Sequence, residues 1–142
     1  MNTVSSSSTG LAGGVDTLRL TLHVLAAAIW VGGQFTVLGI LPTARALGPE
    51  APKAVARAFS KLMWPAYAVL IITGVWNISA THAGQPSNWQ AVLGAKMAVV
   101  VLAGVAAFVH TRVNSKSAVA IWGAVTGLTS IAALAMGVML AG

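Results

Sequence analysis

Residues 18–41 read LRLTLHVLAAAIWVGGQFTVLGIL, an apolar run with only a few isolated polar residues. A helix of about 20 residues crosses a hydrocarbon core about 30 Å thick, so this run can span a membrane. Similar runs occupy residues 62–80, 91–109 and 118–140. None alternates polar and apolar residues as a barrel strand does, and an open sheet cannot satisfy its backbone in lipid. The sequence predicts an all-α integral membrane protein, an up-and-down bundle of four transmembrane helices.

The composition agrees with a bilayer environment. Of the 142 residues, 57% are hydrophobic and 7% are charged, whereas soluble domains carry about 25% charged residues. Residues 17–142 are therefore expected to form one transmembrane domain in contact with lipid. Residues 1–16 contain no Lys or Arg, so they lack the basic segment of a signal peptide and are predicted to be a disordered tail. The second helix is expected to begin near Leu62, with Pro65 in its first turn, where proline is tolerated.

The cations predict the orientation. The two loops expected on one side of the membrane hold six of the eight Lys and Arg residues, namely Arg45, Lys53, Arg57, Lys61, Arg112 and Lys116. Short loops rich in Lys and Arg stay in the cytoplasm. We therefore expect both termini outside. Because these cations account for the net charge of +6, no nucleic-acid partner is expected.

Several kinds of chemistry are excluded by the residue types present. The chain has no cysteine, and its two carboxylates, Asp16 and Glu50, fall outside the apolar runs. Disulfides, thiolate metal sites and paired-carboxylate catalysis are therefore absent. No catalytic residue is predicted, and any chemistry depends on His, Met, Lys or a bound cofactor.

His23 is the leading candidate for a functional residue. His23, Ala27, Trp30 and Gln34 are spaced by four, three and four residues, so they share one helix face, which we expect to point into the bundle. His23 is either an interfacial residue bonded to a carbonyl or a ligand and proton-handling group. We favour the second reading, because an ionisable residue inside a membrane is costly to keep. The adjacent glycines are interpreted as a close-packing contact.

Other candidate ligands are expected near the same end of the bundle. Lys96 lies at a similar depth and either extends to the headgroups or pairs with an anionic cofactor group such as a haem propionate. Met136 and Met139 end the last helix, and thioethers favour Cu(I), although Met is also a common apolar filler. His82, in the second loop, adds another imidazole.

Three motifs, in the order in which they occur along the chain, resemble the copper resistance protein D domain. They are the run from His23 to Gly33, the pair Thr73-Gly74 and the run from Leu93 to Met97. The resemblance covers roughly residues 17–115. It implies copper handling, by binding or transport, in a bacterial inner membrane, with His23, Met136, Met139 and His82 as candidate copper ligands.

The chain is also similar to the HemJ-type protoporphyrinogen oxidases. That family has an essential His and a Trp-x-x-Gly-like run in its first helix and a Lys in a later one, and binds haem b. This resemblance implies a haem-dependent redox protein with His23, Trp30 and Lys96 at the cofactor. Whether the chain is an enzyme stays open. A third reading is an accessory subunit of a larger complex, and a homo-oligomer or a partner membrane protein is expected because four short helices make a poor stand-alone pump.

Overall fold

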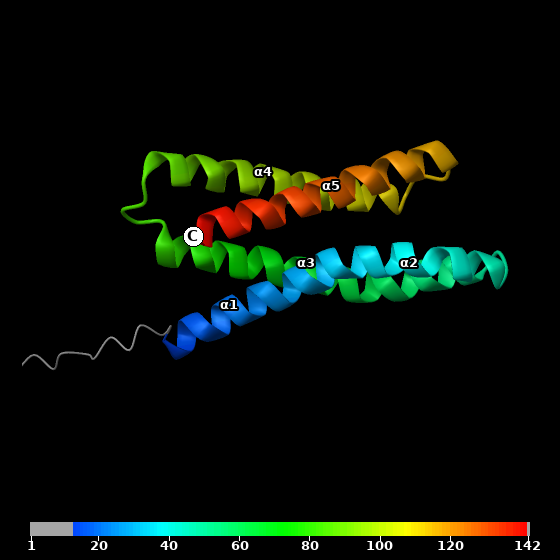
Figure 1. Ribbon diagram of the computed structural model, residues 1–142, viewed down its shortest axis with the longest axis horizontal. Helices are drawn as coiled ribbons and strands as arrows, with labels where there is room; N and C mark the ends of the chain where they lie inside the picture. Colours follow the sequence, from blue (N-terminus) through cyan, green and yellow to red (C-terminus); the bar gives the residue numbers. More distant parts are fainter. Residues whose placement is uncertain (1–12, 142) are drawn as a thin grey trace, which may run out of the picture.

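The structure is a computed structural model that describes residues 13–141 (Figure 1). Its elements are α1 (Gly14–Ala27), the π-helical turn η1 (Ala28–Gly32), α2 (Gly33–Ala46), α3 (Ala51–Thr81), α4 (Ser87–His110) and α5 (Lys116–Ala141). α1, η1 and α2 follow one another without a break and form one long helix. The described residues contain no strand, and four helices are long and apolar enough to cross a membrane. The predicted all-α bundle of four helices is confirmed.

The helices are longer than the apolar runs that predicted them. The connection between α2 and α3 spans residues 47–50 instead of 42–61, so Pro65 lies well inside α3 and not in its first turn. The reason is that residues 51–61 are rich in Ala, Lys and Arg, which favour helix beyond the hydrocarbon core. Residues 14–16, predicted to be part of the tail, belong to α1. The tail up to residue 12 lies outside the described residues.

The two ends of the bundle differ in charge. One end holds the α2–α3 and α4–α5 connections together with the six cations listed above; we call it the basic end, at the right of Figure 1. The other end, at the left, holds the start of α1, the α3–α4 connection and the end of α5. We call it the terminal end.

The helices are arranged as two groups. α4 packs along α5, α1 and α2 pack along α3, and η1 contacts both α3 and α5. Small residues make the α4 surface close-packed: Ala103, Gly104, Ala106 and Ala107 are buried. Small side chains let helix backbones approach closely, which replaces the hydrophobic driving force that is missing between helices in lipid.

An aromatic cluster near the middle of the bundle joins the two groups of helices. The ring centroid of Trp30 lies 4.6 Å from that of Tyr67 and 6.2 Å from that of Trp64. The Tyr67 hydroxyl donates a hydrogen bond of 2.9 Å to the carbonyl of Val100 on α4. Gly104 is required beside it, because a Cβ atom there would overlap the Tyr67 hydroxyl. The cluster therefore fixes how α3 sits against α4.

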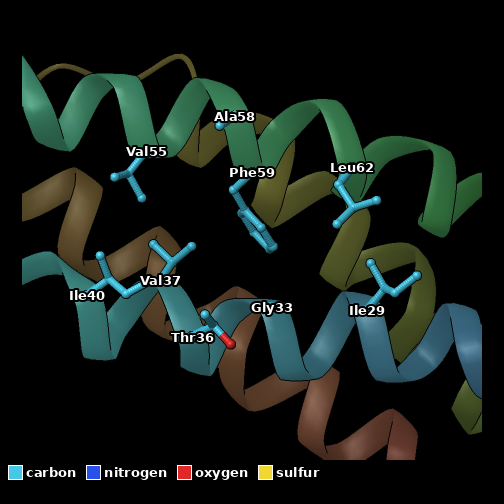
Figure 2. A pocket seen from close by; sticks show the side chains of 9 residues that line it. All are labelled: Ile29, Gly33, Thr36, Val37, Ile40, Val55, Ala58, Phe59 and Leu62. Carbon is cyan, nitrogen blue, oxygen red and sulfur yellow. The ribbon is translucent and has the colours of Figure 1, made fainter.

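A shallow apolar groove runs between α2 and α3 in the half of the bundle nearer the basic end. Figure 2 shows Phe59 of α3 pointing onto the backbone of α2 at Gly33. A Cβ atom at Gly33 would overlap the Phe59 ring. The close-packing contact predicted for the two adjacent glycines is therefore seen at Gly33. Large apolar side chains such as Phe35, Leu38 and Ile72 are exposed outside the bundle, as contact with a lipid bilayer requires.

Candidate cofactor site

His23 lies deep in the span, toward the terminal end. It follows the first residue of α1, Gly14, by nine positions, or about 14 Å along a helix axis. Its Nδ1 atom lies 2.7 Å from the Thr73 Oγ1 atom of α3. The neighbouring Gly74 faces the ring, and a Cβ atom there would make ordinary contact at 3.7 Å from His23 Cε1.

The hydrogen bonds of Thr73 assign the tautomer of His23. The Thr73 hydroxyl has one proton and donates it to the carbonyl of Val69 at 2.6 Å. Thr73 Oγ1 therefore accepts from His23, so Nδ1 carries a proton, which is the only ring proton when the imidazole is neutral. The lone pair of Nε2 is then free to bind a metal or to take up a proton. A second partner that holds one ring nitrogen is the usual arrangement for a ligating His.

Lys96 lies at the same level on α4. It too is nine residues from the first residue of its helix, Ser87. Its Nζ atom lies against α5, where a Cβ atom at Gly137 would come within 3.1 Å of it. The glycine thus makes space for the ammonium group between α4 and α5, and the lysine is half-buried, not extended into solvent.

Trp30 lies deeper than His23 and serves packing and hydrogen bonding. Its Nε1 atom donates a 2.8 Å bond to Ser130 Oγ of α5, and the Gln34 Nε2 atom donates to the same oxygen at 3.1 Å. Gln34 also donates to the Trp30 carbonyl at 3.0 Å. Trp30 sits in the π-helical turn η1, a feature that often occurs at functional sites. Of the four residues predicted to share a face, Trp30 and Gln34 reach one acceptor on α5, whereas His23 bonds to α3.

The other proposed copper ligands differ in how far they are buried in the bundle. Met136 precedes Gly137 and is half-buried, whereas Met139 is 66% exposed on the lipid side of α5. His82 is exposed in the turn after α3. Among residues 13–141, no group of three or more His, Asp or Glu side chains is arranged to hold a metal ion.

Sequence reasoning missed two residues one turn farther out. Arg19 is 4% exposed, and the Asn77 Oδ1 atom of α3 is buried without a hydrogen bond among the described residues. The spacing of these two residues in the sequence could have indicated them. Arg19 is four residues before His23 and Asn77 four after Thr73, so each continues a polar helix face.

The polar groups of this end are therefore mostly cationic or neutral. Arg19, His23 and Lys96 are accompanied by a single carboxylate, Asp16, near the start of α1. Such a set of donors suits a ligand that carries negative charge and can accept a nitrogen ligand. No protein-family model matches the chain, and no curated protein or solved structure shows significant similarity to it.

Proposed function

We propose that this protein binds haem b at the terminal end of the bundle, where His23 Nε2 would hold the iron. The observation that carries the proposal is the bond from His23 Nδ1 to Thr73, which leaves Nε2 as the free nitrogen of the neutral ring. Neutral imidazole with a fixed orientation is the usual haem ligand of membrane redox proteins. When bound, haem supplies one-electron redox chemistry, and the protein supplies ligation and electrostatics.

The charge of Lys96 supports haem over a lone copper ion. An ammonium group beside His23 repels Cu(I), but it stabilises a carboxylate, and haem b carries two propionates. The described spans contain no carboxylate facing Lys96, so a propionate would be its first anionic partner. The similarity of the His23, Trp30 and Lys96 motifs to HemJ-type oxidases agrees with this choice.

Copper binding is the second candidate, and one observation favours it. The free Nε2 of His23 and the half-buried thioether of Met136 both lie toward the terminal end, and imidazole with thioether is a ligand set for Cu(I). A copper-resistance function, by binding or transport, would then follow the similarity to the copper resistance protein D domain. Met139 and His82 would have to turn inward to complete that site.

We also propose that the basic end faces the cytoplasm of a bacterial cell, so that both termini and the cofactor site face outward. The six cations at the basic end support this orientation. A homo-oligomer or a partner membrane protein completes the proposed assembly.

The test is the visible spectrum and metal content of the protein purified in mild detergent. We expect a Soret band in the wild type and in the control His82→Ala, and its loss in His23→Ala. Copper bound without haem, and lost in His23→Ala and Met136→Leu, would establish the second candidate. Neither haem nor copper, with a His23→Ala protein that behaves as the wild type, would overturn both and favour an accessory subunit.

A further inference from the structure

Arg19 has donors that no described residue satisfies. Its Nη2 atom donates to the Asp16 Oδ1 atom at 2.9 Å, but its Nε and Nη1 atoms are buried and have no hydrogen-bond partner among residues 13–141. The guanidinium side chain is 5% exposed, so bulk water does not serve these donors. A guanidinium stays charged in proteins, and a buried charge with unpaired donors is destabilising. The position therefore calls for an additional acceptor.

An unpaired acceptor lies at the same level of the neighbouring helix. The His23–Thr73 bond sets the register of the antiparallel helices α1 and α3. Arg19 is one turn before His23, and Asn77 is one turn after Thr73, so the two residues are at one level. The Asn77 Oδ1 atom is buried without a partner. A group that satisfied both residues would need an acceptor for Arg19 and a donor for Asn77.

The depth of Arg19 indicates what such a group is. Arg19 follows Gly14 by five residues, about 7.5 Å along the helix, and the headgroup layer on each side of the hydrocarbon core is about 5 to 8 Å thick. Lipid phosphates lie in this layer. Arginine binds phosphate through charge-assisted hydrogen bonds from several nitrogens at once.

We propose that Arg19 and Asn77 form a binding site for a phosphate group that carries a hydrogen-bond donor beside it. A phospholipid headgroup with a glycerol hydroxyl or an ethanolamine ammonium has this chemistry, and inorganic phosphate has it through its own hydroxyl. Phosphatidylcholine lacks the donor. The site is independent of haem or copper, because it uses neither His23 nor Lys96.

Native mass spectrometry of the delipidated full-length protein in detergent tests the site. Phosphatidylglycerol, phosphatidylethanolamine and phosphatidylcholine are added separately, and the lipid retained per chain is measured. We expect one glycerol or ethanolamine lipid to be retained in preference to choline lipid. Arg19→Gln should weaken this binding about tenfold. The control Arg45→Gln removes an exposed arginine at the basic end and should leave it unchanged.

Asn77→Leu tests the need for a hydrogen-bond donor on the ligand separately from the binding of its phosphate. It removes the unpaired acceptor, so the variant should fold, retain phosphate binding and lose the preference for glycerol over choline lipid. His23→Ala should retain the lipid, and Arg19→Gln should retain the absorption spectrum of the wild type, so this site and the proposed cofactor site fail or succeed separately.

A parallel thermal shift with inorganic phosphate in lipid-free detergent distinguishes the source. Stabilisation by phosphate that Arg19→Gln abolishes, with no lipid retained, identifies free phosphate as the ligand. Equal binding of choline lipid by the wild type together with no effect of phosphate would overturn the site, as would an unaltered Arg19→Gln protein. If Arg19→Gln fails to fold, Arg19→Lys can replace it, because lysine keeps the charge but cannot bind phosphate through several nitrogens at once. The headgroup preference of the wild-type protein tests the site without any variant.

Discussion

The hydroxyl proton of Thr73 determines which nitrogen of His23 is free. Because that proton goes to the Val69 carbonyl, the hydroxyl oxygen can only accept from the ring. An apolar side chain in its place would leave Nδ1 without an acceptor and the tautomer unassigned. A threonine on the neighbouring helix thus sets which nitrogen of the neutral imidazole is free.

Under the proposed ligation of haem by His23, Thr73→Val should lower haem affinity by about 10- to 100-fold, the usual effect of removing the partner of a ligating His. Thr73→Ser keeps the hydroxyl and should bind as the wild type. Absorbance titration with haem measures both. Thr126→Val is the control, since Thr126 is also buried and also donates to its own helix, at the Trp122 carbonyl. Equal affinity of Thr73→Val and Thr126→Val would contradict the assignment.

Ser130 holds η1 against α5, and Ser130→Ala should be destabilising. The Trp30 Nε1 donor would lose its hydrogen-bond acceptor, and Gln34 would lose one of its two acceptors. Leaving the buried Trp30 donor unpaired costs about 1 to 3 kcal/mol. Ser79→Ala changes an exposed serine that bonds only within its own helix, so it should have little effect. Unfolding in mixed micelles with increasing SDS measures the difference, and similar free energies for the two variants would argue against this role.

At the scale of the helices, the glycines differ in how much space a Cβ atom would find around them. Gly33 and Gly104 lie against the aromatic rings of α3, Gly74 has ordinary contact with the His23 ring, and Gly39 has open space. The sequence shows only a Gly at each position. The facing side chain decides whether an added methyl group fits.

Gly33→Ala should destabilise the protein by about 1 to 3 kcal/mol, because the methyl group would displace Phe59. Gly39→Ala on the same helix should be neutral or stabilising by up to about 1 kcal/mol, because Ala has the higher helix propensity. Gly74→Ala should fold and keep the spectrum of the wild type. The same SDS titration compares the three, and a Gly33→Ala protein as stable as Gly39→Ala would show that α2 and α3 are not closely packed there.

The sequence predicted where the helices lie but not how long they are. The apolar runs identified every span, because hydrophobic length is what lipid requires. Residues 51–61 continue α3 outside any apolar run, since helix propensity needs no hydrocarbon around it. The π-helical turn at Trp30 also left no signal in residue spacing.

The orientation of the whole molecule can be tested with introduced cysteines, because the chain has none. Ser115→Cys lies at the basic end and Ser87→Cys at the terminal end. In intact spheroplasts, a membrane-impermeant maleimide should label Cys at position 87 and leave position 115 unlabelled until the cells are lysed. The reverse pattern would place the cofactor site on the cytoplasmic side.

The sequence by itself determined the environment and the element type, because both follow from composition and run length: four apolar helices in lipid with six of the eight cations at one end. It also selected His23 and Lys96, since ionisable residues are conspicuous in apolar runs. Only the tertiary structure joined His23 to Thr73, left Arg19 and Asn77 unpaired, and turned Met139 toward lipid. These depend on the rotation and register of helices far apart in the chain, which packing sets and local sequence does not.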